Sequence, residues 1–482
     1  MKGSTQTYHS YGNIYASTAE VFYPKTIQEL QEILAFCRQN GRKITPAGSF
    51  HSFDRQNAGK DVVISMKHFD QITCDAQEGI LVVGSGASWG EIFEVVYEQD
   101  CLLYTCITGS APTAGGTLSV NSYSIWSPGV GKEGCHCLSF KIVTTEGELF
   151  TCSRTENSDL FYGVIGGMGL LGFVVEITYK ILPVSSPLEI DIQVKDYDNI
   201  NDLEARLDLR KAQDLSTLED VQSQCALFYM HQGQPQFIAV DRSYKKVPTK
   251  RKGSKLTFLA AVLASGLIRF FPELGNKIIY KDKHKPASKR TIFKNLNFRH
   301  YGTFWAQPDY EWSKKFSRFF QKLGYEPKMY QNCYFIPNEG NKTTQFVKQA
   351  YALSENKQLK TFMFDVTYSP QDEPFVLSHA THIDGFLVNI TFMEKNDQRD
   401  ILAAFQQLNQ LAWEMGGNLN LGKNCFIEPN LLEKMYAPAL EKFVQLKQQY
   451  DPSNLLSSDF FEHYFPSFFL ENKGVETLCH AL

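Results

Sequence analysis

The stretch RKITPAGSFHSFD, Arg42 to Asp54, decides how the first part of this chain is organised. Its first residues, Arg42–Thr45, are typical of a short β-strand, which ends where a proline and a glycine follow. A single histidine, His51, then stands in a loop of small residues. Because glycine lets main-chain N–H groups converge and approach a ligand closely, the tip of this strand is a candidate anion-binding site.

Helix and strand signals surround this stretch on both sides. Thr26 and Glu29 form a capping-box pattern that begins a helix, and Gly41 is placed to end it. The loop is followed by predicted strands at 61–66 and 80–86, a helix at 88–99, a hairpin at 139–153 and a strand at 172–184. After about Pro187, charged helices alternate with strands at 225–230, 236–240, 328–337, 359–368 and 385–393, and a long helix follows at 430–450. The pattern predicts an α+β fold whose second half is an antiparallel sheet backed by helices.

Composition excludes several functional classes. The 482 residues are 43% hydrophobic and 21% charged, which is globular, and the length favours roughly two to four domains. A net charge of −4 gives no basic signature for nucleic acid. The first residues lack an apolar core, so no secretory signal is expected. The 11 cysteines are scattered, and Cys135-His136-Cys137 is not a zinc spacing, so we expect reduced thiols, no metal site and a cytoplasmic location.

A basic and then apolar stretch at 245–271 allows two interpretations. Lys245–Lys255 carries six positive charges, and Leu256–Phe271 is too short for a transmembrane span and is interrupted by Arg269. Such a stretch can hold a protein at the inner, anionic face of a membrane as a peripheral contact. The alternative is a core or lid helix behind a solvated loop.

The stretch GMGLLG, Gly167–Gly172, matches a dinucleotide fingerprint but lacks its context. That fingerprint requires a helix after the glycines, so that the helix N-terminus meets the pyrophosphate. The residues that follow alternate with a period of two, which predicts a strand. A nicotinamide-binding Rossmann fold is therefore not expected.

Three loops rich in glycine and serine remain, at Ala47–Ser52, Gly109–Leu118 and Gly163–Gly172. Each is joined to predicted strands within the first 172 residues. One such loop is an ordinary turn, but three together indicate a large phosphate-bearing ligand lying across a sheet.

In combination, these motifs resemble the vanillyl-alcohol-oxidase superfamily of FAD flavoproteins, which has a PCMH-type FAD-binding domain. The residues that carry the resemblance are VFYPKTIQELQEILAFCRQNGRKITPAGSFHSFD, LVVGSGASWGEI, TAGGTLSVNSYS, TEGELFTCSRTENSDLFYGVIGGMGLLGFVVEITYKI and NLGKN. The aldonolactone and alditol oxidases and the decaprenylphosphoryl-ribose oxidases fit best. The resemblance implies two α/β subdomains for FAD in residues 1–186, an antiparallel substrate cap in 187–420 and a C-terminal segment, 421–482, that returns to the FAD domain.

The histidine of the opening loop gains a role from this resemblance. In the lactone and alditol branch, G-x-x-H-S carries a histidine bonded to the flavin 8-methyl group, and Gly48–Ser52 matches it. The resemblance to this branch therefore implies that His51 binds FAD covalently. The alternative is a loop histidine beside non-covalent FAD, because the decaprenylphosphoryl-ribose branch has no histidine here and binds FAD without a bond. Cys106 is interpreted as a small buried hydrophobic residue, although the relatives that attach the flavin through two residues use a cysteine nearby.

The resemblance also implies a set of FAD-binding residues in the three loops. The set comprises Pro46, Ala47, Gly48, Ser49, Phe50, His51, Ser52, Gly109, Ser110, Thr113, Gly115, Gly116, Ser119, Gly166, Gly167, Gly169, Gly172 and Val174. The first two loops would hold the pyrophosphate, and the third would pass beside the ribityl chain and adenine. Asp54 closes its motif and is expected to cap the local turn.

The expected catalytic residues are Lys423, Asn420 and Tyr123. Lys423 stands where both branches carry a lysine, and an ammonium there stabilises anionic reduced flavin or, if its pKa is lowered, acts as the base. Asn420 replaces a family histidine, and Tyr123 stands where relatives often carry one. His379 and His382 are expected to lie at the surface, with a role as base as the alternative. By analogy, Tyr334 and Asn389 lie on inward-facing cap strands.

Together these features predict an FAD-dependent oxidoreductase that dehydrogenates an alcohol carbon by hydride transfer to flavin N5. The substrate is a polyol, a lactone or a lipid-linked pentose, since His51 favours one branch and the C-terminal residues favour the other. The electron acceptor, oxygen or a quinone, stays open. The alternatives are an FAD-dependent reductase of a lipid double bond, because ENSDLFY also resembles sterol reductases, and a non-catalytic flavin or lipid binder.

Overall fold

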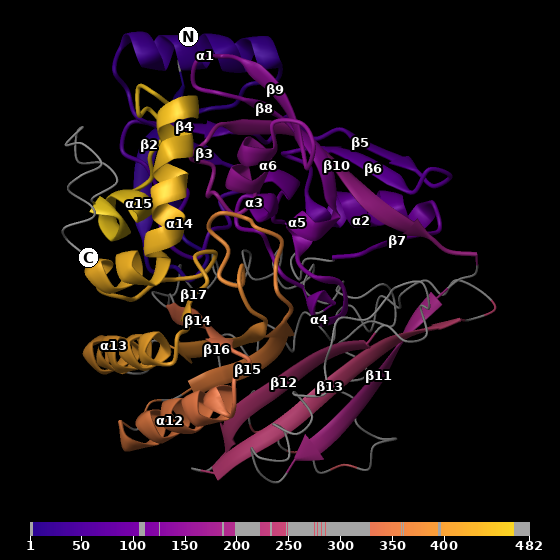
Figure 1. Ribbon diagram of the computed structural model, residues 1–482, viewed down its shortest axis with the longest axis vertical. Helices are drawn as coiled ribbons and strands as arrows, with labels where there is room; N and C mark the ends of the chain where they lie inside the picture. The colour runs from indigo at the N-terminus through magenta and orange to yellow at the C-terminus, as the bar shows by residue number, and fades with distance from the viewer. Residues whose placement is uncertain are drawn as a thin grey trace.

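The computed structural model describes residues 3–105, 111–124, 126–185, 188–197, 222–231, 234–246, 328–357, 361–393 and 397–466, with single positions at 248, 274, 277, 281, 285 and 359 (Figure 1). The basic and apolar stretch at 245–271 lies almost entirely outside them, so membrane contact stays a prediction. Within the described residues, no helix combines the length and the apolar character needed to cross a bilayer.

The first sheet contains the strand that leads into the histidine loop. Its order is β1 (Ser4–His9), β2 (Ala16–Phe22), β4 (Val62–Ser65) and β3 (Ile44–Ala47), with β2 and β3 both parallel to β4. Helix α1 (Ile27–Gln39) connects β2 to β3 and buries Leu30, Ile33, Leu34 and Cys37. The hydroxyl of Thr26 accepts a hydrogen bond from the Glu29 N–H, and Gly41 takes a left-handed φ of 60° after the helix, as the sequence predicted.

The second sheet is antiparallel and adjoins the first. Its strands are β5 (Ile72–Asp75), β6 (Ile80–Gly84), β10 (Phe173–Pro183), β8 (Cys137–Val143) and β9 (Leu149–Ser153), with β7 (Cys101–Leu103) also on β10. The helices around it are α2 (Trp89–Glu98), α3 (Ala114–Leu118), α4 (Ser127–Val130), α5 (Glu133–His136) and α6 (Ser158–Val164). Because Gly172 leads directly into β10 and not into a helix, the exclusion of a Rossmann fold is confirmed.

The third sheet lies beside these two in Figure 1 and forms the cap. Its order is β11 (Leu188–Tyr197), β13 (Gln234–Lys246), β12 (Gln222–His231), β15 (Thr361–Ser369), β16 (Gly385–Met393), β14 (Met329–Pro337) and β17 (Asn418–Leu419). Helices α12 (Lys342–Asn356) and α13 (Gln398–Glu414) pack on one face, where Phe392 contacts Phe405. With a period of two, Leu387 and Asn389 lie on the opposite face.

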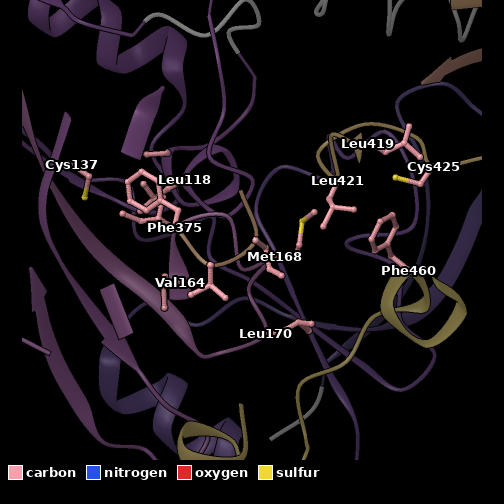
Figure 2. Close-up of a cluster of buried hydrophobic side chains, with 14 of the residues drawn as sticks. Leu118, Cys137, Val164, Met168, Leu170, Phe375, Leu419, Leu421, Cys425 and Phe460 are labelled. Atoms are coloured by element: carbon pink, nitrogen blue, oxygen red, sulfur yellow. The ribbon is translucent and has the colours of Figure 1, made fainter. Parts of the chain in front are cut away.

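The C-terminal helices α14 (Pro429–Tyr450) and α15 (Asp459–Tyr464) return to the first sheet. Ile44 donates to the Leu455 carbonyl at 2.8 Å and accepts from the Ser457 N–H at 2.9 Å, which joins the chain end to β3. Figure 2 shows one buried cluster that contains Leu118 and Met168 from the N-terminal part together with Leu421 and Phe460. The α+β fold predicted from the sequence is confirmed.

Candidate functional site

The three small-residue loops meet in space. A Cβ added at Gly48 would lie 2.1 Å from the Thr113 hydroxyl oxygen, so the first and second loops touch. A Cβ added at Gly169 would lie 3.3 Å from the Pro46 ring, and the Gly166 N–H donates to the Leu118 carbonyl at 3.0 Å. The third loop therefore packs against both of the others.

These loops surround a cleft that is partly open to solvent. The predicted FAD-binding residues that line it are Pro46, Ala47, Gly48, Ser52, Thr113, Gly115, Gly116, Ser119, Gly167, Gly169, Gly172 and Val174. Residues that line the cleft but were not predicted are Gln56, Asn57, Met66, Ser85, Val120, Val164, Met168, Leu171 and Phe173.

Among the other predicted FAD-binding residues, Ser49, Phe50, His51 and Gly166 do not line the cleft. Phe50 has a φ of 57°, and its ring packs on Tyr8 with centroids 4.6 Å apart. The Ser49 hydroxyl is buried with no partner in the described chain, and Gly166 lines a smaller neighbouring cavity. Gly109, Ser110 and Cys106 lie outside the described residues.

The loop after β3 is tied to the loop after β17. The Gln56 amide donates to the carbonyls of Leu421 and Lys423, both at 2.9 Å, and the Asn424 amide donates to Phe53 at 2.8 Å. The buried carboxylate of Asp54 accepts from the Cys425 N–H at 3.1 Å. Asp54 thus holds the C-terminal loop as well as its own turn, where it accepts from the Arg55 N–H at 2.8 Å.

A row of rings brings His51 and Lys423 to the same region. The His51 imidazole packs on Tyr11 at 4.6 Å between centroids, and Tyr11 packs on Phe53 at 4.8 Å. The ammonium nitrogen of Lys423 lies 3.7 Å from the centre of the Phe53 ring, a cation–π contact. An imidazole near the start of the chain and an amine near its end are therefore linked through Tyr11 and Phe53, although neither His51 nor Lys423 lines the cleft.

A cluster of buried and partly buried polar groups lies where the third sheet faces this junction. The Asn389 amide donates to the Tyr123 hydroxyl at 2.6 Å and also to Asp365, its cross-strand neighbour. Cys333 lies opposite Asn389 on the other side, in β14. The side-chain oxygen of Asn389 is buried and has no partner within the described chain. It is therefore an acceptor available to a ligand.

Burial changes the proton affinities in this cluster. It lowers the pKa of Lys423, against the opposing attraction of Cys333 and Asp365. It raises the pKa of Asp365 to about 6, although the Asn389 hydrogen bond and Lys423 favour the charged form. It also raises the pKa of Tyr123 well above its usual value, so this phenol stays protonated.

The remaining sequence expectations have mixed outcomes. Asn420 is buried, and its side-chain oxygen accepts from the Gly422 N–H at 2.9 Å, which shapes the turn that carries Lys423. The surface position expected for His379 is wrong, since His379 is 8% exposed, whereas His382 is exposed.

Tyr334 donates to Asn409 of helix α13 at 2.9 Å. It therefore lies on the helix-covered face of the sheet, because neighbouring residues of a strand such as Cys333 and Tyr334 point to opposite faces. Asp365 and Cys333 were missed because their strands carry no distinctive motif.

The lining of the cleft suits a phosphate-bearing ligand. A Cβ at Gly115 would lie 2.7 Å from the Ser85 Cβ, so main chain approaches the cleft closely there, as at Gly48. Two N-terminal sheets meeting at such a cleft under an antiparallel cap define an FAD-binding protein of the PCMH type. FAD would be held by these loops.

Comparison with known families supports this class. Residues 18–153 match the family described as FAD binding domain, and residues 314–464 match the family described as D-arabinono-1,4-lactone oxidase. The two matches follow each other along the chain, so its N-terminal part is similar to PCMH-type FAD-binding domains and its C-terminal part is similar to the lactone oxidases.

Individual relatives agree over part of their length. An uncharacterized oxidoreductase of the fasciation locus of Rhodococcoides fascians is 30% identical, over 36% of this chain and 39% of its own length. D-arabinono-1,4-lactone oxidase of Debaryomyces hansenii is 24% identical, over 41% of this chain and 39% of its own. Cytokinin dehydrogenase 2 of Arabidopsis thaliana is 26% identical, over 34% of each chain. The chain thus spans less than two fifths of each of these relatives.

Proposed function

We propose that this protein is an FAD-dependent oxidase or dehydrogenase that oxidises an alcohol carbon of a neutral, sugar-like substrate such as a polyol or an aldonolactone. The observation that carries the proposal is the unpartnered, buried oxygen of Asn389 beside Lys423, Asp365 and Tyr123. Similarity to the D-arabinono-1,4-lactone oxidase family over 314–464 supports the substrate class. In this proposal residues 1–186 and 421–482 hold FAD, and residues 187–420 cover the substrate.

The polar cluster suits the deprotonation of a substrate hydroxyl. Asn389 would accept a hydrogen bond from that hydroxyl, and the protonated Tyr123 would fix the amide in this orientation. Lys423 with its lowered pKa, or Asp365 with its raised pKa, would take the proton, since each lies nearer neutrality than usual. FAD, when bound, supplies the two-electron acceptor for the hydride that leaves the carbon.

His51 is proposed as the covalent attachment point of FAD. It follows the cleft-lining Gly48 by three residues and lies against Tyr11 at the same junction as Lys423. A neutral imidazole at this position would hold the flavin end of the cofactor. Oxygen or a quinone is proposed as the final electron acceptor.

The test is anaerobic mixing of the purified holoprotein with a matched panel. The panel contains polyols, aldonolactones, simple secondary alcohols and NADPH. We expect bleaching of the flavin absorbance by at least one polyol or lactone and none by NADPH. Bleaching by NADPH alone would favour the reduction of a lipid double bond, and bleaching by nothing in the panel would overturn the proposed activity. Oxygen uptake compared with quinone reduction then identifies the acceptor.

A further inference from the structure

A second, smaller cavity adjoins the cofactor cleft. It has room for about one water-sized group and lies between the loop at 377–379 and the turn at 420–422. Val120 and Met168 line both this cavity and the cleft, so the two spaces are neighbours across these side chains. A group bound in this cavity would therefore lie next to whatever occupies the cleft.

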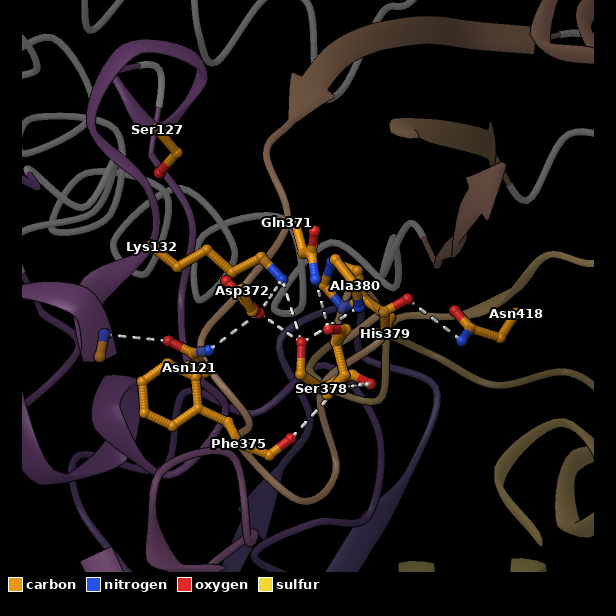
Figure 3. Close-up of polar contacts among 12 residues, drawn as sticks. Asn121, Ser127, Lys132, Gln371, Asp372, Phe375, Ser378, His379, Ala380 and Asn418 are labelled. Atoms are coloured by element: carbon orange, nitrogen blue, oxygen red, sulfur yellow. Dashed lines mark hydrogen bonds and ion pairs between the residues drawn. The ribbon is translucent and has the colours of Figure 1, made fainter. Parts of the chain in front are cut away.

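The charged group in its wall is neutralised within the protein. Of the described residues that line the cavity, Lys132 alone carries a formal charge, and its ammonium lies 2.6 Å from Asp372 with both side chains 1% exposed. Asp372 also accepts from the Ser378 hydroxyl and, at 3.3 Å, from the Asn121 amide (Figure 3). The wall is thus polar without net charge, which disfavours a carboxylate or phosphate ligand.

His379 offers this cavity an unused hydrogen-bonding atom. The residue is 92% buried, its ring packs on Phe335 with centroids 5.4 Å apart, and its Nε2 has no partner in the described chain. Burial, together with the Lys132 charge, lowers the pKa of His379 well below its usual value, so the imidazole is neutral. A buried polar atom without a partner is costly, and a hydroxyl can satisfy either tautomer because it both donates and accepts.

We propose that this cavity is a hydroxyl-binding subsite in which His379 Nε2 hydrogen-bonds an uncharged hydroxyl of the substrate. The inference rests on the proposed function and adds a specificity to it: neutral polyhydroxylated compounds bind in preference to the corresponding acids. His379 here binds and positions the substrate. It does not take part in proton or hydride transfer.

The experiment measures substrate affinity apart from turnover. Holoprotein is titrated anaerobically with an aldonolactone and with its open-chain aldonate, and binding is followed from flavin spectral changes before reduction. His379→Phe removes the polar atom, His379→Gln retains one, and His382→Phe is the exposed control on the same loop. We expect about tenfold or greater weakening in His379→Phe, partial recovery in His379→Gln and wild-type affinity in His382→Phe. FAD content, the spectrum of the unliganded protein and the thermal midpoint should stay unchanged.

Several outcomes would overturn the subsite. Equal affinity of wild type and His379→Phe, tighter binding of the aldonate than of the lactone, or a changed FAD content without ligand would each reject it. If His379→Phe does not fold, a wild-type titration with monodeoxy polyols replaces it, and no loss of affinity with any of them rejects the subsite. If wild type is neither bound nor reduced by any neutral polyol or lactone, the proposed function falls as well. If the substrate reduces wild type and the His379 variants bind it as tightly as wild type does, the subsite is rejected and the proposed function stands.

Discussion

The cofactor cleft and the polar cluster that faces the third sheet differ in composition. The cleft has glycines and serines in its wall, at positions such as Gly48 and Gly115 where no Cβ fits. The polar cluster contains Lys423, Asp365 and Asn389, and burial shifts the pKa of Lys423 and of Asp365. In the proposed function, FAD binding therefore depends on the close approach of backbone in the cleft, whereas the chemistry depends on the few side chains of the polar cluster.

Replacing His51 by alanine is expected to have the largest effect, because it removes the proposed bond to FAD altogether. Acid precipitation should leave yellow flavin in the wild-type pellet and release all of it from His51→Ala. His9→Ala, at the exposed end of β1, serves as the control and should behave as wild type. Flavin released from wild type by acid would show that the cleft alone retains the cofactor.

Replacing Lys423 by methionine should slow flavin reduction by about a hundredfold or more while FAD stays bound. The reason is that Lys423 belongs to the polar cluster, whereas the cofactor is proposed to be held mainly by the cleft. Stopped-flow absorbance measures the reduction rate, and Lys442→Met, at an exposed lysine of α14, is the matched control. Equal rates in wild type and Lys423→Met would remove this lysine from the chemistry.

Adding a methyl group at Gly48 should weaken FAD binding by about tenfold or more with little change in chemistry once FAD is bound. The new Cβ would lie 2.1 Å from the Thr113 hydroxyl oxygen, and such overpacking costs about 1–3 kcal/mol. Fluorescence titration of apoprotein with FAD measures the effect. The double variant Gly48→Ala, Thr113→Ala removes the clashing oxygen and should recover part of the affinity; no recovery would contradict the steric explanation.

The pH dependence of reduction should report Asp365. Since its pKa is raised to about 6, the carboxyl is neutral below that pH and charged above it. A rate that needs the charged form therefore rises as the pH increases through about 6. Asp365→Asn should lose this rise and be about tenfold slower at neutral pH, a modest loss because Lys423 remains. If Asp365→Asn keeps the rise in rate through about pH 6, another group is responsible for that rise. Asp384→Asn is the control within the cap.

The sequence predicted the cleft better than the polar cluster, for a physical reason. Glycine spacing is a local signal, so the three loops and the strand after Gly172 could be placed from neighbouring residues alone. The polar cluster depends on which strands of the third sheet pair and in which register. Asp365, Asn389 and Cys333 become neighbours through β15, β16 and β14, which no short motif encodes. His379 was misplaced because a polar loop that inserts between two parts of the molecule looks, in sequence, like any exposed loop.

The hydrogen bonds between the loops at 53–57 and 421–425 have a consequence for synthesis in the cell. Gln56, Asp54 and Phe53 leave the ribosome more than 360 residues before their partners Leu421, Lys423, Asn424 and Cys425. A nascent chain can form the early sheet but has nothing to bind the loop at 53–57 until its last eighth is translated. Firm retention of FAD should therefore be a late event in biogenesis, and chains that terminate before residue 420 should emerge without colour.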